Sequence, residues 1–285
     1  MKTTPDGSRH PLVVFILGSG RCGSTLLDMM LNAHPQIAGL GELSSIHFAA
    51  GDPTQAVDPA TRDYWTVVAD LYESQTGERF HSVDVRHPAW RRIRSLDTSG
   101  GAWVRRNCAL FAAAAQAADA PIVTDSSKAS QRLYLLEREG CGPVRVLHLC
   151  RDARAVANSY RRRYGSLAVG LRTWATSSAT ARFLRYRVPS ERWHRLKYED
   201  LATDPAVALG RICAFLDIPY AAEMLDFERH AYFGLAGSPT TREHMGAIAL
   251  DERWKHELSS WQRAVIGVSV GLLNRLEGYP AFADD

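Results

Sequence analysis

Short apolar runs alternate with amphipathic stretches along this chain of 285 residues. Residues 12–17 (LVVFIL) form a continuous apolar run with β-branched residues in its middle, which is typical of a strand buried on both faces. A glycine-rich segment follows, and apolar residues then recur at helical spacing until His34 and Pro35, which end the predicted helix. This succession of strand, glycine turn and helix indicates the start of a β–α–β unit.

The same alternation continues towards the C-terminus. Because strands alternate with helices, we expect an α/β fold in which a central, mostly parallel sheet is covered by helices on both faces. Ligands of such folds bind at the carboxyl ends of the strands. The pattern predicts further strands over 121–124, 144–150 and 193–198, mainly helical structure over 61–120, and helices over 204–216 and 251–276, the last with Trp254, Leu258, Trp261, Val265, Val268 and Leu272 on one face.

Composition narrows the class of protein. The chain carries 34 Lys and Arg against 31 Asp and Glu, a net charge of +3, which disfavours a general nucleic-acid binder. Apolar residues make up 46% of the chain, enough for a core and too many for wholesale disorder. Since no repeat or long linker divides the sequence, we expect one domain over residues 1–285, with a flexible tail over residues 1–10.

The five cysteines are Cys22, Cys108, Cys141, Cys150 and Cys213. They form no C-x-x-C pair and are odd in number, so we expect neither a disulfide framework nor a zinc site, and a reducing compartment. The only N-terminal apolar run has six residues, too few for a signal peptide or a membrane span. The sequence therefore predicts a cytoplasmic protein without a membrane span.

The glycine-rich segment matches two phosphate-binding patterns. GSGRCG (18–23) fits the dinucleotide fingerprint G-x-G-x-x-G, and residues 18–25 nearly fit the nucleotide P-loop G-x-x-x-x-G-K-[ST]. In both patterns glycines let backbone amides close on an anion, and the next helix points its positive end at it. The segment therefore predicts a phosphate site.

Departures from each pattern separate the two readings only partly. Ser24 stands where a P-loop has its lysine, the nearest cation is Arg21, and no convincing carboxylate for Mg²⁺ follows, which disfavours phosphoryl transfer from ATP·Mg. Glu42 lies 19 residues beyond Gly23, which fits the acidic residue of an NAD(P)-dependent oxidoreductase with a Rossmann fold. The first motif alone leaves that alternative open.

A second motif follows the best strand in the chain. Arg151 stands at the end of the strand over 144–150, Asp152 is placed to cap the next helix, and Ser159 lies about two helical turns further on. A strand-end arginine with a helix hydroxyl indicates a second anion site. An enzyme that binds a nicotinamide cofactor has no evident use for a second anion site. A protein that binds a nucleotide with phosphates on both sides of its ribose needs one.

With two further segments, these motifs resemble the sulfotransferases that use 3′-phosphoadenosine-5′-phosphosulfate (PAPS), a family with a three-layer P-loop-like fold. GSGRCGSTLL (18–27) is similar to the family's 5′-phosphosulfate loop, and RDARAVANS (151–159) to its 3′-phosphate motif. KYEDLATDP (197–205) is similar to a segment near the adenine pocket, and AHPQIAGLGEL (33–43) to a stretch of the tyrosylprotein and carbohydrate branch that contains a glutamate base. The four segments occur in the family order, whereas residues 47–120 match no motif.

This resemblance implies roles for individual residues. Glu42 would be the general base, and Lys128 and Arg21 would stabilise the charge of the transition state. The 5′-phosphate would be held by Arg21 with Cys22, Gly23, Ser24 and Thr25, the 3′-phosphate by Arg151 and Ser159, and the adenine side by Tyr198 and Arg242. His47 and His87 are reserve candidates for the base. Residues 47–120 would bind a hydroxyl-bearing small molecule, and no metal is implied. A non-catalytic nucleotide-binding module is the remaining alternative, and the oligomeric state stays open.

Overall fold

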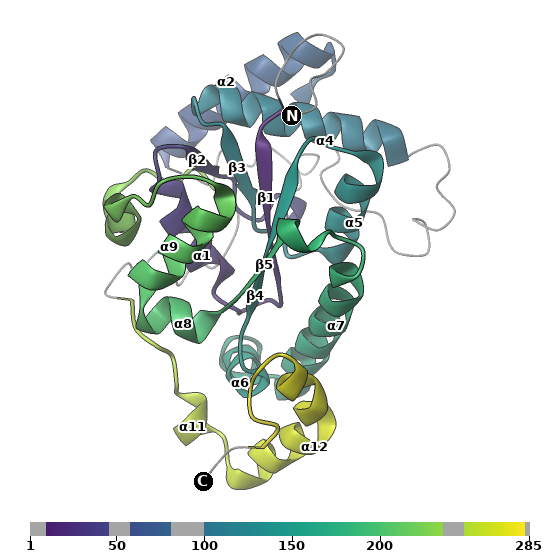
Figure 1. The fold of residues 1–285 in the computed structure, drawn as a ribbon, viewed down its shortest axis with the longest axis vertical. Helices are drawn as coiled ribbons and strands as arrows, with labels where there is room; N and C mark the ends of the chain where they lie inside the picture. The colour runs from purple at the N-terminus through teal and green to yellow at the C-terminus, as the bar shows by residue number, and fades with distance from the viewer. Residues whose placement is uncertain (1–9, 46–57, 81–99, 236–247, 283–285) are drawn as a thin grey trace.

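A single parallel sheet organises the molecule. The computed structural model describes residues 10–45, 58–80, 100–235 and 248–282. Five strands pair in the order β2-β3-β1-β4-β5, every pair parallel, with β1 in the centre (Figure 1). The predicted α/β fold is therefore confirmed. The strands are β1 (Leu12–Gly18), β2 (Ile37–Gly39), β3 (Ile122–Asp125), β4 (Val144–Cys150) and β5 (Trp193–Lys197).

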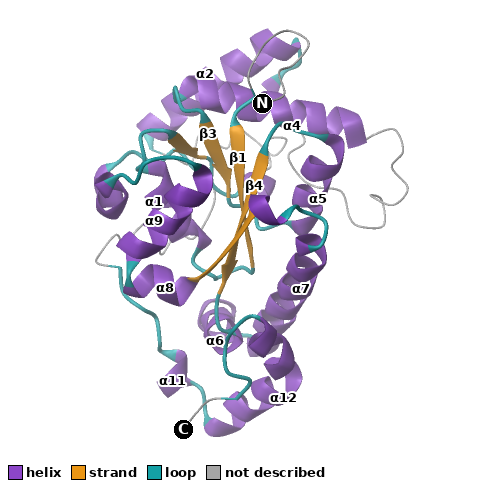
Figure 2. Cartoon of the chain, in the orientation of Figure 1, coloured by secondary structure: helices purple, strands orange, loops and turns teal. Residues whose placement is uncertain are grey.

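Helices cover both faces of the sheet, as expected (Figure 2). One face packs against α1 (Ser24–Asn32), α8 (Tyr198–Thr203), α9 (Pro205–Leu216) and the 3₁₀ helix η6 (Ala222–Arg229). The other packs against α4 (Gly100–Ala117), α5 (Ser130–Glu139) and α7 (Leu167–Arg185), with α2 (Pro59–Thr76) on α4. The remaining helices are η1 (Leu43–Ser45), α6 (Ala153–Tyr164), η5 (Ser190–Arg192), α11 (Trp254–Glu257) and α12 (Ser260–Leu276). None of the helices described is long and apolar enough to cross a membrane.

Side chains of β1 enter both cores in turn. Val13, Phe15 and Leu17 belong to the cluster with α4, whereas Val14 and Ile16 belong to the cluster with α1 and α9. All five are buried, because alternate side chains of a strand point to opposite faces. The continuous apolar run of the sequence thus forms a strand buried on both faces, as predicted.

The predicted single helix over 251–276 is wrong, because two helices occupy this region. α11 ends at Glu257 and α12 begins at Ser260. Ser259 accepts a hydrogen bond from the backbone of Gln262, whose side chain accepts one from the Ser259 amide, so a capping box starts the second helix. Leu258 is buried, whereas Trp261 is mostly exposed, so the predicted apolar face is not one continuous core face.

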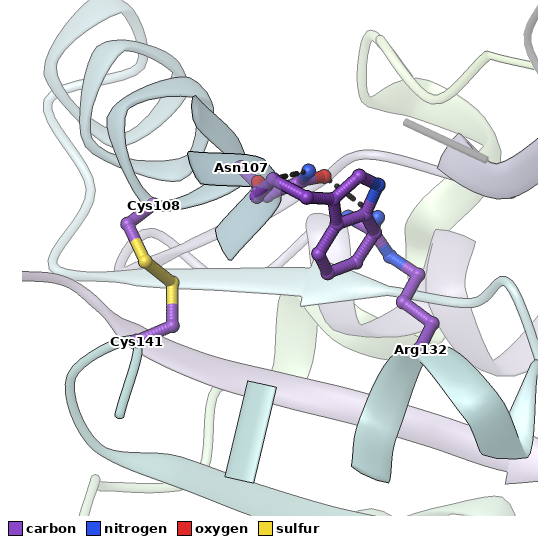
Figure 3. Close-up of a disulfide and its surroundings, with 5 residues drawn as sticks. Asn107, Cys108, Arg132 and Cys141 are labelled. Carbon is purple, nitrogen blue, oxygen red and sulfur yellow. Dashed lines mark hydrogen bonds between the residues drawn. A yellow bond between two sulfur atoms is a disulfide. The ribbon is translucent and has the colours of Figure 1, made fainter. Parts of the chain in front are cut away.

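A disulfide corrects the interpretation of the cysteines. Cys108 on α4 and Cys141 between α5 and β4 are bonded, with their Cα atoms 5.4 Å apart (Figure 3). They are 33 residues apart in the sequence, and their approach depends on the packing of α4 beside the end of α5. Disulfides persist mainly in oxidising compartments, so this pair weighs against the expectation of a reducing one. Cys22, Cys150 and Cys213 are free and buried.

Beside the disulfide lies a buried polar network (Figure 3). Arg132 of α5 forms an ion pair of 2.6 Å with Asp125 and donates to the Asn107 side-chain oxygen at 2.7 Å. Asp125 also accepts from the Ser127 amide at 3.0 Å. Asp125 thereby holds the turn after β3 that leads to Lys128.

We expect the disulfide to contribute about 3 kcal/mol to the free energy of unfolding, because it closes a loop of tens of residues in the unfolded chain. The double variant Cys108→Ser/Cys141→Ser should therefore unfold at lower urea concentration than the parent protein without reductant. With reductant the two should converge. Equal stability under both conditions would contradict the bond, as would five reactive thiols in the denatured, unreduced protein.

Candidate active site

Each strand delivers one predicted residue to the carboxyl edge of the sheet. Glu42 and Lys128 follow β2 and β3 by three residues, Arg21 follows β1 by three, and Arg151 and Tyr198 directly follow β4 and β5. In the spatial order of the strands, the edge therefore carries Glu42, Lys128, Arg21, Arg151 and Tyr198. Neighbouring strands lie about 5 Å apart, so one row of side chains spans the edge.

The glycine loop takes the shape that anion binding requires. Arg21 and Gly23 adopt left-handed backbone conformations, with φ values of 65° and 97°. Gly23 is the N-cap of α1, and since it has no side chain it cannot itself cap the amides of the first turn. A Cβ atom on Gly23 would lie 2.6 Å from the Tyr198 ring, which is why only glycine fits there. Ser24 and Thr25 are buried in this first turn.

The two motifs of the sequence meet in space. The Arg21 side chain donates from Nε to the Ser159 hydroxyl of α6 at 3.0 Å. Arg151 donates from Nη1 to the backbone carbonyl of Arg21 at 2.9 Å. The glycine loop and the strand-end motif are therefore in direct contact. Asp152 caps α6 by accepting from the Arg154 amide, as predicted.

Arg151 is the most heavily engaged of these cations. Its guanidinium lies 4.1 Å from the centre of the Tyr198 ring, and its Nη2 forms an ion pair of 3.1 Å with Asp251. Its Nε is buried without a hydrogen-bond partner. Tyr198 in turn donates to the carbonyl of Ala249 at 3.3 Å. The arginine is thus placed for an anion, but a carboxylate contacts it in this structure.

Asp251 was not singled out by the sequence analysis. Arg253 donates to both of its carboxylate oxygens, at 2.7 and 2.9 Å, and Arg151 contacts one of them. These hydrogen bonds and charges, Arg253 first, hold the pKa of Asp251 well below its usual range despite partial burial. Nothing in the local sequence LDERW reveals that this carboxylate reaches Arg151 from 100 residues away.

Cys22 is a packing residue of the loop. Its thiol is fully buried, and burial raises its pKa, although Lys128 and Arg151 act in the opposite direction. A nucleophilic cysteine needs a lowered pKa. Burial of the thiol therefore favours a packing role for the Cys22 side chain, and both cations lie close enough to the glycine loop to affect it electrostatically.

Glu42 and Lys128 form the second group of the edge. The Lys128 ammonium lies 2.5 Å from a Glu42 carboxylate oxygen and donates to the Ser126 carbonyl at 3.0 Å. Lys128 has a left-handed backbone with φ 60°, a conformation that costs about 1–3 kcal/mol for a non-glycine residue. The Glu42 amide donates to the Leu235 carbonyl at 2.9 Å, which holds the residue beside the loop after η6. A carboxylate and an ammonium are therefore held together beside the glycine loop.

Several predicted residues lie outside the described part of the chain. These are the two reserve bases and one donor-binding candidate, namely His47, His87 and Arg242. The helical expectation for 47–120 is confirmed where the structure describes it, by α2 and α4.

A buried carboxylate on α1 was also missed. Asp28 interrupts the apolar run TLLDMML and is fully buried. A charged residue among apolar helix positions was the signal that could have found it, because an apolar helix face rarely buries a carboxylate without partners.

One further cluster has the composition of a metal site. His148, Cys150 and Glu277 are buried, with one potential ligand atom each within 4.8 Å of the others. However, Arg195 donates from Nε to the Cys150 sulfur at 3.3 Å and lies 3.6 Å from a Glu277 oxygen. Burial lowers the pKa of His148 to about 3, so this ring is neutral. The guanidinium already supplies positive charge to the cluster, which we interpret as a structural junction between β4, β5 and the end of α12.

Comparisons with known proteins find similar sequences and structures over most of the chain. The model of the sulfotransferase family matches residues 11–222. A curated relative, carbohydrate sulfotransferase 6 of Homo sapiens, is 21% identical over 99% of this chain and 85% of its own length.

Two solved structures share the fold. The sulfotransferase domain of the olefin synthase from Synechococcus PCC 7002 has a TM-score of 0.64 and 22% identity, covering 98% of this chain and 99% of the domain. The sulfotransferase domain from the curacin biosynthetic pathway has a TM-score of 0.54 and 20% identity, covering 87% of this chain and 90% of the domain.

Removal of the Asp251 charge should lower stability in a pH-dependent way. The pKa of Asp251 is depressed in the folded protein, so its contribution to stability is complete above the unfolded value of about 4 and is lost as the pH falls below it. The difference in unfolding free energy between the parent and Asp251→Asn should therefore be larger at pH 7 than at pH 3. Urea unfolding at both pH values measures it, with the exposed Asp226→Asn as control. A difference that grows on acidification would contradict this electrostatic assignment.

Proposed function

The chain belongs to the sulfotransferase family, and we propose that it transfers the sulfuryl group of PAPS to a hydroxyl group of a small-molecule acceptor. The single observation that carries the proposal is the row of Glu42, Lys128, Arg21, Arg151 and Tyr198 along one sheet edge. Membership of this family rules out the nicotinamide-dependent oxidoreductase and disfavours the non-catalytic module, the two alternatives that the motifs left open.

The donor would lie across the three strand ends of β1, β4 and β5. Its 5′-phosphate would be held by the first-turn amides of α1, by the Ser24 and Thr25 hydroxyls and by Arg21. Its 3′-phosphate would bind Arg151 and Ser159, with Tyr198 towards the adenine. The Arg21–Ser159 hydrogen bond supports this placement, because it brings the two phosphate sites next to each other, as one ribose requires.

A phosphate at Arg151 requires the Asp251 carboxylate to leave. A carboxylate and a phosphate compete for the same guanidinium, and a bisphosphate offers more charge and further contacts with Arg21 and the α1 amides. Asp251 keeps Arg253 as an alternative partner at 2.7 Å, so it would not be left without a cation. Donor binding is therefore an exchange of anions on Arg151.

The transfer itself would be a direct, in-line displacement. The acceptor oxygen attacks sulfur, the new O–S bond forms as the bond from sulfur to the bridging oxygen of the 5′-phosphate breaks, and adenosine 3′,5′-bisphosphate (PAP) leaves. Glu42 takes the proton of the acceptor hydroxyl. Lys128 and Arg21 offset the negative charge that develops on the sulfuryl and leaving oxygens, by analogy with phosphoryl transfer. The Glu42–Lys128 contact supports these roles because it places base and cation side by side.

The small-molecule acceptor and the cytoplasmic location remain predictions from the sequence, and the Cys108–Cys141 bond weighs against the latter. Transfer from radiolabelled PAPS to glucose, 4-nitrophenol and 1-octanol tests the acceptor class, and transfer to none of these or further hydroxyl compounds would contradict the proposal.

PAP should stabilise the protein more than adenosine 5′-monophosphate, NAD or ATP·Mg at equal concentration, because two phosphate sites are proposed. Arg151→Ala should weaken PAP binding by about 10- to 100-fold, the effect of a lost charge-assisted hydrogen bond, and should weaken binding of the monophosphate by less. Asp251→Asn should bind PAP more tightly than the parent. Thermal shifts and calorimetry measure these affinities, with the exposed Arg229→Ala as control. Equal affinity of the parent for PAP and the monophosphate would remove the 3′-phosphate site.

Glu42→Gln should lower kcat by about 100-fold or more while the dissociation constant of PAP stays nearly unchanged, because the amide cannot accept the acceptor proton. Steady-state transfer from PAPS and calorimetric titration with PAP separate the two quantities. The matched control is the exposed Glu191→Gln on η5, which directly precedes β5 and so lies at the opposite end of the parallel strands, and this variant should keep the parent kcat. A Glu42→Gln protein with unchanged turnover would remove Glu42 as the base.

A further inference from the structure

Asp28 lies in the middle of α1 and is fully buried. One of its carboxylate oxygens accepts from the Gly41 amide at 3.0 Å, from the Tyr232 hydroxyl at 2.5 Å and from the Ser126 hydroxyl at 3.4 Å. The other accepts a short hydrogen bond from the Thr124 hydroxyl. One carboxylate thus connects α1 to four places in the chain.

Two of these places lead directly to the proposed base and cation. Gly41 precedes Glu42, and Ser126 lies two residues before Lys128. The two residues are also hydrogen-bonded to each other, because the Ser126 amide donates to the Gly41 carbonyl at 2.9 Å. Lys128 then donates to the Ser126 carbonyl, which closes the connection. The Asp28 carboxylate therefore contacts both the loop that carries Glu42 and the loop that carries Lys128, where the two loops are hydrogen-bonded to each other.

Folding stability alone does not explain a carboxylate at this position. Burial raises the pKa of Asp28, against the hydrogen bonds from Thr124, Tyr232 and Gly41, and the neighbouring charge of Asp125 adds to the rise. Within the described part of the chain, no lysine or arginine forms an ion pair with Asp28. Apolar residues often replace buried charges without loss of stability, so filling a helix face does not by itself require a carboxylate.

We propose that Asp28 is a positioning residue, whose carboxylate fixes Glu42 relative to Lys128 through the backbone of Gly41 and the side chain of Ser126. The inference rests on the proposed function, because it assumes that Glu42 and Lys128 act on the reacting groups. Asp28 itself touches neither substrate. Its effect is to hold two loops in one geometry, which matters because a displacement of about 1 Å at a reacting group lowers rates by about 100-fold.

The test is a double-mutant cycle between Asp28→Ala and Glu42→Gln. Asp28→Ala should lower kcat by about 100-fold, with the dissociation constant of PAP changed by less than about threefold. In the Glu42→Gln background the same substitution should lower kcat by much less than about 100-fold further, because one of the two groups that Asp28 positions is already lost. Transfer from radiolabelled PAPS to 4-nitrophenol, or to water if no acceptor reacts, supplies the rates.

Asn32→Ala is the matched control. Asn32 lies one turn further along α1, accepts from the Gly39 amide at 3.0 Å and donates to the Ala231 carbonyl at 2.7 Å. It therefore connects the same helix to the segments beside Gly41 and Tyr232, but it does not contact the Ser126 turn. Asn32→Ala should lower the melting temperature and leave kcat within about threefold of the parent.

The outcomes distinguish a failure of the proposed function from a failure of the positioning role of Asp28. A parent protein that transfers nothing from PAPS contradicts the proposed function. If the parent protein is active, any of three results contradicts the role of Asp28 alone. The folded Asp28→Ala variant keeps the parent kcat, or its loss of kcat multiplies in full with the loss caused by Glu42→Gln. The third result is an Asn32→Ala variant that loses as much kcat as Asp28→Ala. If Asp28→Ala does not fold, Asp28→Asn carries the same cycle, since its amide cannot accept from all four donors.

Discussion

Parallel pairing of the strands is the constraint on which the site depends. In a parallel sheet every carboxyl end lies at the same edge, so residues that follow different strands become neighbours regardless of their distance in the sequence. Glu42, Lys128, Arg21, Arg151 and Tyr198 come from segments that span more than half of the chain. The order β2-β3-β1-β4-β5 arranges them with the carboxylate and lysine on one side and the arginines and tyrosine on the other. A reaction that needs an acceptor side and a donor side fits that division.

Buried acidic side chains hold the loops at this edge. Asp28 binds the Gly41 amide and the Ser126 hydroxyl, Asp125 binds the Ser127 amide and the Arg132 guanidinium, and Asp152 caps α6. Arg21 and Lys128 can then adopt left-handed backbones that non-glycine residues otherwise avoid. The edge is therefore preorganised before any ligand binds, which is what electrostatic stabilisation of a transition state requires.

At the proposed 3′-phosphate site, Arg151 is contacted by a carboxylate of its own chain. The guanidinium supports the Arg21 carbonyl and lies against the Tyr198 ring, so two of its functions are structural. Its remaining face contacts Asp251, a residue from the far end of the chain. A buried cation without such a partner would be costly to the folded protein in the absence of ligand, and the carboxylate offsets that cost.

Local sequence was sufficient for β1, β3, β4 and β5, the glycine loop, the cap at Asp152 and the identity of the strand-end residues, because backbone propensity, apolar periodicity and glycine content act over a few positions. The strand β2 (Ile37–Gly39) was not predicted, because three residues are too few for an apolar run to mark it. The break between α11 and α12 was also encoded locally, in Ser259 and Gln262, and was overlooked. Only the tertiary structure decided that Asp251 reaches Arg151, that Cys108 meets Cys141, and that Asp28 joins two loops. These contacts link segments far apart in the chain, and no local propensity specifies which distant side chain will fill a given space once the helices have packed on the sheet.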